Sequence, residues 1–136
     1  MSEEKIEHIL KQGIYGTPET KPEERKLFLS TLRERVYIAL TMSQVKEKDV
    51  YPEVEQQMKG ILSLDQVHMY LNGHLDYSYL SKYIQLATKY NCPFTMVQNN
   101  THHSPMGLVL ADEEAVERDS IYIEDALFKQ DIASVT

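Results

Sequence analysis

The stretch VHMYLNGHLDYSYLSKYIQLATKYNCPFTMV, residues 67–97, decides the fold. Its first five residues alternate in character and residues 94–97 are short and β-prone, which predicts a strand at each end. Between them, residues 77–90 repeat apolar side chains with a helical period, and Asp76 is a suitable N-cap. A strand, a helix and a second strand in this order predict two parallel strands joined by a right-handed crossover.

Residues 36–40, VYIAL, are a nearly continuous apolar run and predict a further parallel strand. Residues 49–62 gather their apolar side chains in one helical arc, which indicates a second helix packed on the sheet. Residues 106–111 predict a fourth strand. The loop before it is too short for a crossover helix, so we expect this strand to lie antiparallel beside residues 94–97. Residues 121–123 are a candidate fifth strand.

The N-terminal part predicts a short helix over residues 2–12, an ordered arm rich in glycine and proline, and a helical turn towards Leu29. The expected fold is a single α/β (α+β) domain over residues 1–136. It comprises an N-terminal helix and arm (1–30), a β-α-β-α-β-β core with a mixed sheet (35–123) and an acidic C-terminal tail (124–136).

Composition excludes several classes of protein. The 136 residues are 42% hydrophobic, enough for a core, and carry a net charge of −7. From Asp112 onward there are eight acidic and two basic residues, which we interpret as a solvated segment, and no basic stripe suits a nucleic-acid partner. A single cysteine excludes a disulfide framework and a cysteine-based zinc site. The acidic N-terminus and the lack of a long apolar run predict a cytoplasmic protein without membrane contact.

No motif commits the chain to catalysis. Phosphate-binding glycine loops and the nucleophile elbow are missing from the sequence. Cys92 has no neighbouring histidine or aspartate, so it is interpreted as a buried apolar residue. His102 and His103 are adjacent, and side chains adjacent in an extended loop point to opposite sides, so the pair cannot chelate one ion. We expect no catalytic residue, no metal and no cofactor.

Polar side chains gather where the three expected parallel strands end. Ligands of open α/β sheets bind outside the carboxyl ends of parallel strands. These side chains are neutral and suit a small polar ligand or a peptide backbone, although the asparagines could equally be turn formers. The candidate ligand-binding residues are Ser43, Gln44, Asn72, His74, Asn99, Asn100, His102 and His103, with Thr41 and Thr101 beside them.

The helix over residues 77–90 has an apolar sector of about 180°, wider than a surface helix needs. Part of this sector is a stripe of tyrosines, and we expect it to be covered by the N-terminal arm or by a second subunit. The candidate interface residues are Tyr79, Tyr83 and Tyr90.

At residues 10–45 the pattern becomes specific. It contains Gly13-Ile14-Tyr15-Gly16-Thr17-Pro18, then Lys21-Pro22-Glu23-Glu24-Arg25, then Arg33-Glu34-Arg35-Val36. The chain resembles the YueI-like family of small bacterial proteins, which have no assigned activity. The family pattern has a glycine and an aromatic residue where this chain has Ser30 and Leu32. The resemblance implies a scaffold similar to chorismate-mutase-like proteins, which is shared with the kink-turn RNA binders.

Three functions remain open. The leading hypothesis is a binding or regulatory module without catalytic activity, acting as a monomer or homodimer on a protein partner or a small ligand. The alternative is a small enzyme with its site at the carboxyl edge of the parallel strands. RNA binding by analogy of fold is third, because residues 41–47 lack the glycine and the Asn-Glu pair of the kink-turn binders and the charge is unfavourable.

Overall fold

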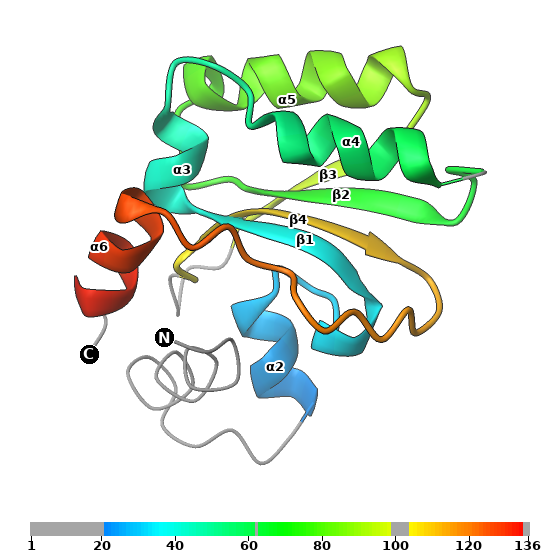
Figure 1. The fold of residues 1–136 in the computed structure, drawn as a ribbon, viewed down its shortest axis with the longest axis horizontal. Helices are drawn as coiled ribbons and strands as arrows, with labels where there is room; N and C mark the ends of the chain where they lie inside the picture. The colour runs from blue at the N-terminus through cyan, green and yellow to red at the C-terminus, as the bar shows by residue number, and fades with distance from the viewer. Residues whose placement is uncertain (1–20, 62, 99–103, 135–136) are drawn as a thin grey trace.

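The computed structural model describes residues 21–61, 63–98 and 104–134, and this part of the chain forms one mixed sheet with helices on both faces (Figure 1). The strands are β1 (Val36–Thr41), β2 (Val67–Asn72), β3 (Phe94–Val97) and β4 (Met106–Asp112). The helices are α2 (Lys21–Leu27), α3 (Met42–Lys46), α4 (Pro52–Gly60), α5 (Tyr77–Lys89) and α6 (Ala126–Ser134), with a 3-10 turn, η1, at Arg33–Arg35.

The strand order is β1-β4-β2-β3. The parallel pairing of β2 with β3 confirms the predicted strand–helix–strand unit. The predicted place of β4 is wrong: it lies between β1 and β2 and is antiparallel to both, so it does not neighbour β3 and β1 does not pair with β2. The reason is burial. Residues 106–111 are buried throughout and take an inner position, whereas the residues of β3 are exposed or half-buried and lie at an edge. The edge strand β1 is buried as well, because the segment at Ile121 and Tyr122 lies along its outer side.

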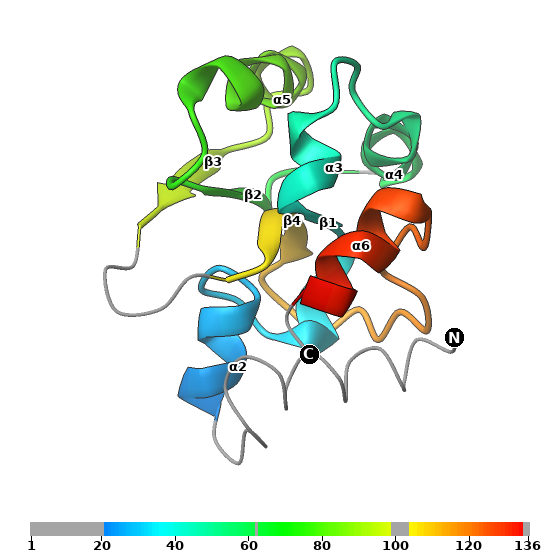
Figure 2. The same cartoon turned by 90° about the vertical axis from the view of Figure 1, so that its left-hand side faces the viewer.

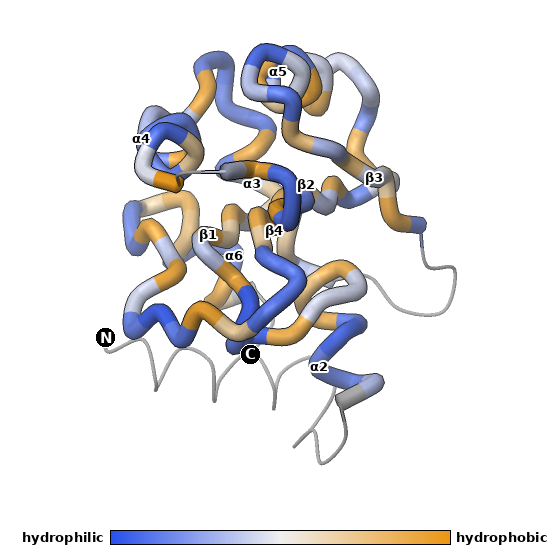
Figure 3. Tube along the Cα trace, turned by 90° about the vertical axis from the view of Figure 1, so that its right-hand side faces the viewer, coloured by the Kyte–Doolittle hydropathy of each residue, from blue (hydrophilic) through white to orange (hydrophobic). Residues whose placement is uncertain are grey.

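Two apolar layers hold the sheet. On one face α4 and α5 pack over the strands, with Met58, Leu80 and Tyr83 fully buried or nearly so. On the other face α2 and α6 pack with the segment that follows β4, and Leu27, Phe28 and Phe128 are buried there. Figure 2 shows α5 above β3, and α4 above the end of the sheet that holds β1. In Figure 3, hydrophobic residues recur along the strands, which lie between the two sets of helices.

The segment after β4 differs from its prediction. The fifth strand is reduced to one parallel bridge, Ala39 with Tyr122, and the Ala39 N–H donates to the Ile121 carbonyl at 2.8 Å. Residues 124–134 are not a solvated tail, because α6 packs Phe128 and Ile132 into the apolar cluster that contains Leu27 and Phe28. The edge of β1 is therefore covered. The helix expected at residues 2–12 and the arm up to residue 20 lie outside the described residues.

The helix α3 has no counterpart in the sequence-based prediction. It begins directly after β1, and the Gln44 side-chain oxygen accepts a hydrogen bond from the Thr41 N–H at 2.9 Å. Gly107 of β4 lies against this turn: a Cβ at Gly107 would stand 2.7 Å from Val45 Cγ2 and 3.0 Å from the Thr41 carbonyl oxygen. Close approach of α3 to the central strand therefore needs a residue without a side chain.

Replacing Gly107 with alanine should lower the free energy of unfolding by about 1–3 kcal/mol, because the added methyl group overpacks the α3–β4 contact. Gly60→Ala is the matched control, since a Cβ there meets nothing within 4 Å and alanine is the better helix former. Urea denaturation of both variants measures the difference. Equal stability of Gly107→Ala and the wild type would show that α3 does not need this close contact.

Candidate functional site

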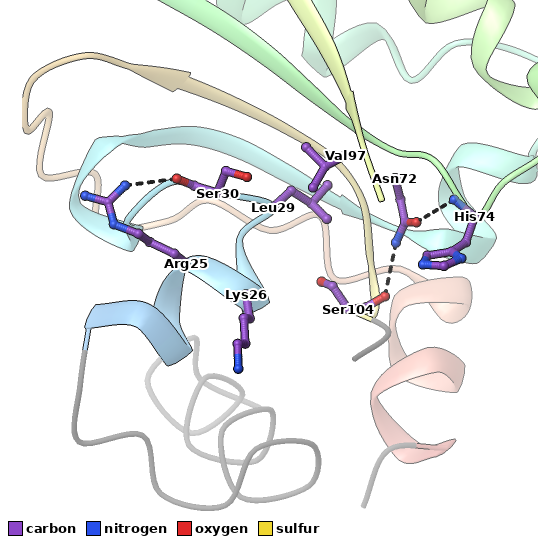
Figure 4. Close-up of a pocket in the computed structure, with 8 residues that line it drawn as sticks. All are labelled: Arg25, Lys26, Leu29, Ser30, Asn72, His74, Val97 and Ser104. Atoms are coloured by element: carbon purple, nitrogen blue, oxygen red, sulfur yellow. Dashed lines mark hydrogen bonds between the residues drawn. The ribbon is translucent and has the colours of Figure 1, made fainter. Parts of the chain in front are cut away.

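A pocket of about 220 Å³ opens between α2 and the carboxyl ends of β2 and β3 (Figure 4). The residues come from the end of α2 and the turn after it, from the ends of the two parallel strands and from the segment just before β4. The lining residues are Arg25, Lys26, Leu29, Ser30, Asn72, His74, Val97 and Ser104. The pocket therefore stands at the sheet edge where the sequence predicted a site.

Asn72 forms the floor of this pocket. Its side chain is buried, and its amide nitrogen donates to the Ser104 carbonyl at 3.3 Å and to the Met106 carbonyl at 3.0 Å. Its amide oxygen accepts the His74 N–H at 2.9 Å, which shapes the turn after β2. One side chain thus joins the end of β2 to the start of β4.

Ser104 continues this network to α2. Its hydroxyl donates to the Leu27 carbonyl at 2.6 Å and accepts the Met106 N–H at 3.1 Å. Leu27 is the last residue of α2, so the hydroxyl ties the end of that helix to the central strand. Buried hydrogen bonds therefore fix the positions of α2, β2 and β4 around the pocket.

The rim on the α2 side is positively charged and has an unusual backbone. Leu29 and Ser30 are consecutive non-glycine residues with φ values of 55° and 95°. Such conformations cost about 1–3 kcal/mol each and concentrate at ligand sites. The Arg25 guanidinium donates to the Ser30 carbonyl at 3.0 Å, and Lys26 is exposed beside it. Among the described lining residues no carboxylate offsets these two cations.

Ser43 and Gln44 do not line this pocket, although they follow β1 as predicted. Gln44 is buried, and its amide nitrogen donates to the Ile123 carbonyl at 2.8 Å and to the Asp125 carboxylate at 3.0 Å. The Ser43 hydroxyl donates to the Asp131 carboxylate at 2.6 Å. Both side chains anchor α6 and the segment before it, so we assign them a structural role.

Asp125 is the centre of that anchor. It accepts hydrogen bonds from the Tyr51 hydroxyl at 2.5 Å and from the Phe128 N–H at 3.0 Å. Burial acts to raise the pKa of Asp125, but the hydrogen bonds donated by Tyr51, by backbone N–H groups and by Gln44 outweigh it and leave the pKa below its usual value. Burial and the bond to Asp125 raise the pKa of Tyr51 above its ordinary value. The ionised carboxylate therefore stabilises the fold.

The structure brings together only part of the predicted site. Asn72 and His74 line the pocket, whereas Asn99, Asn100, Thr101, His102 and His103 lie outside the described residues. Sequence reasoning missed the residues from α2 and its turn, Arg25, Lys26, Leu29 and Ser30. The adjacent basic pair at the end of a short helix was a usable signal. Its position opposite β2 depends on long-range packing that local pattern does not show.

The tyrosine stripe is not one surface. Tyr83 is fully buried, and its hydroxyl accepts the Tyr51 N–H at 3.0 Å, so its predicted interface role is wrong. The Tyr90 hydroxyl donates to the Glu55 carboxylate of α4 at 2.7 Å, and Tyr79 is 36% exposed. The helix α4 lies beside α5, on the sheet face opposite to α2 (Figure 1).

The described residues give little support for a reactive cysteine or a metal site. Cys92 is buried, and burial raises the pKa of its thiol to about 11, which disfavours the reactive thiolate. Within residues 21–61, 63–98 and 104–134 no group of three or more His, Cys, Asp or Glu residues could hold a metal ion. None of the helices in these residues has the length and apolar character needed to cross a membrane.

Asp125→Asn should lower the free energy of unfolding near neutral pH by about 1 kcal/mol. The substitution removes the charged acceptor of the Asp125 hydrogen bonds, and the effect is modest because solvent partly screens the carboxylate. Since the folded-state pKa of Asp125 is lowered, its contribution is present above the unfolded pKa of about 3.9 and is lost as the pH falls through the folded value. Urea titrations over a pH series should show the two proteins converging in acid. Asp65→Asn, an exposed carboxylate, is the control. A difference independent of pH would contradict the assignment.

Comparison with known proteins places the chain in a family. Residues 3–122 match the family model described as "Protein of unknown function (DUF1694)". The chain is 44% identical over 132 residues to "Uncharacterized protein YueI" of Bacillus subtilis (strain 168), covering 97% of this chain and 98% of that protein. The crystal structure of the YueI protein from Bacillus subtilis superposes with a TM-score of 0.81 at 43% identity, covering 96% and 99% of the two chains. The chain belongs to the DUF1694 family of proteins of unknown function, to which the YueI-like resemblance pointed.

Proposed function

We propose that this protein is a binding module without catalytic activity, and that its site is the pocket between α2 and the carboxyl ends of β2 and β3. The ligand is a small molecule that carries a carboxylate or phosphate group. The observation that carries the proposal is the pairing of two cationic side chains with hydrogen-bonding groups in one pocket at this sheet edge.

Charge supports an anionic ligand. The chain has a net charge of −7, yet the described lining of the pocket holds Arg25 and Lys26 and no carboxylate. The planar guanidinium of arginine suits the oxygens of carboxylates and phosphates, and lysine adds a mobile point charge. The Ser30 hydroxyl and the His74 imidazole add hydrogen-bonding groups around the same space (Figure 4).

The backbone supports a binding site as well. The left-handed conformations of Leu29 and Ser30 persist only because surrounding structure enforces them, and the Arg25 bond to the Ser30 carbonyl is part of that enforcement. The Ser30 N–H also donates to the Arg25 carbonyl at 2.7 Å, which is the hydrogen bond of a Schellman helix ending, so this turn ends α2 and forms a fixed rim of the pocket. The volume, about 220 Å³, suits a compact metabolite rather than a macromolecule.

The polar groups favour binding over catalysis. The Asn72 amide and the Ser104 hydroxyl are already engaged with the main chain of β4 and α2. Ser104 donates its proton to a carbonyl rather than to a base, so it is not arranged as an activated nucleophile. The described lining offers no pair of carboxylates for acid–base work.

Isothermal titration calorimetry with inorganic phosphate, pyrophosphate and citrate tests the proposal. At least one of these anions should bind, and Arg25→Gln or Lys26→Gln should each weaken it by about fivefold, because a partly exposed charge contact is worth up to about 1 kcal/mol. The double variant should lose more than either single variant.

Lys48→Gln is the matched control, since it removes the same charge from an exposed position between α3 and α4, away from the pocket lining. Binding by none of the three anions would contradict the proposal. An equal loss of affinity in Lys48→Gln and Lys26→Gln would also contradict it, because the effect would then come from net charge alone.

A further inference from the structure

The two edge strands of the sheet, β1 and β3, differ in whether another segment covers them. At the β1 edge, Ile121 and Tyr122 lie alongside Ala39, and the Ile121 carbonyl accepts a hydrogen bond from the Ala39 N–H. At the other edge, no described strand follows β3. Phe94 and Met96 of β3 are 37% and 48% exposed, which is unusual for large apolar side chains on a strand. The β3 edge is therefore open where the β1 edge is covered.

The main chain of this open edge is unpaired in a regular pattern. The Pro93 carbonyl accepts the Met69 N–H at 2.9 Å, and the Val97 carbonyl accepts the Gly73 N–H at 2.8 Å. Because a parallel ladder uses alternate residues of each strand, the N–H and C=O groups of Phe94 and Met96 point away from β2. None of the described residues bonds to these outward groups.

This edge also lacks the devices that natural proteins use to prevent edge-to-edge pairing. Residues 93–98 contain no charged side chain, and the proline at their start leaves both outward-pointing N–H groups intact. Edge strands are normally blunted by lysine, by an inward-pointing charge or by a bulge. An unprotected, neutral edge in a chain of net charge −7 is the property expected of an interface.

We propose that two copies of this chain pair through β3, antiparallel and about a two-fold axis at Thr95, to form one continuous sheet. In this register Phe94 of each copy lies opposite Met96 of the other. The outward-pointing groups of these two residues then exchange four backbone hydrogen bonds, which is the pattern of an antiparallel ladder. The two exposed apolar side chains stand on the same face and cover each other, and Thr95 meets its own copy on the opposite face.

A second copy fits this edge because the strand is complementary to itself. A two-fold axis requires that the same residues serve as both surfaces, and the pairing of Phe94 with Met96 satisfies this twice. The adjoining side of α5 is suitable as well. Lys82, Lys89 and Tyr90, which bond to α3 and α4, lie on one side of α5. The side of α5 away from them carries four uncharged residues, Tyr77, Ser81, Ile84 and Thr88. Two negatively charged copies can thus approach through a neutral surface.

Sedimentation velocity over a wide range of protein concentration tests the proposal with the full chain. The wild type should show a monomer–dimer equilibrium, and Met96→Lys should raise the dissociation constant by at least about tenfold, because it buries an unpaired ammonium opposite an apolar side chain. Gln56→Lys is the matched control, since it adds the same charge at an exposed position on α4 and should leave the equilibrium unchanged.

Hydrogen exchange identifies the occupant of the edge. Dimer formation should protect the Phe94 and Met96 amides, and this protection should increase with protein concentration. A monomer at all concentrations would overturn the proposal, as would a dimer that Met96→Lys leaves intact. Protection that does not depend on concentration would also overturn it, because another segment of the same chain would then pair with β3.

Discussion

The buried side chain of Asn72 is the interaction on which the rest of this structure depends. It bonds to the main chain of β4 and of the turn after β2, and Ser104 extends the same network to the end of α2. A buried polar group left without partners costs about 1–3 kcal/mol, so these bonds specify one arrangement of the three elements. That arrangement leaves a pocket between them. The network is thus both a packing constraint and the floor of the proposed binding site.

The position of β4 explains the remaining architecture. The buried strand β4 separates β1 from β2, which leaves β1 and β3 at the two edges. The segment at Ile121 and Tyr122 lies along the β1 edge, and α6 then packs on the same face of the sheet as α2. The β3 edge receives no comparable segment among the described residues. The proposed ligand site and the proposed pairing surface lie at different parts of β3: the pocket at its carboxyl end and the pairing surface along its outer edge.

Local pattern predicted the four strands and the helices α4 and α5 but not α3, and long-range packing decided how these elements are arranged. The strand–helix–strand unit over residues 67–97 was predictable because alternation, helical period and turn residues occur in sequence. The place of β4 was not, because a short loop fixes only the direction of the next strand and not its neighbour. Tyr83 and Gln44 show the same limit: residue type indicated a surface or a ligand site, and burial under α4 or against the segment before α6 gave each a structural role. Two of the eight residues that line the pocket were predictable, since Asn72 and His74 lie at the end of a strand, whereas Arg25 and Lys26 reach the pocket only through the packing of α2.

The central claim is that the pocket bounded by α2 and the ends of β2 and β3 binds a small anion. The most direct test is to map amide chemical-shift changes by NMR while pyrophosphate is added. We expect the largest changes at Leu29, Ser30, Gly73, His74 and Ser104, with a common dissociation constant, and we expect them to disappear in the Arg25→Gln, Lys26→Gln double variant. Changes confined to other surfaces, such as α4 or α6, or shifts that persist in the double variant, would contradict it.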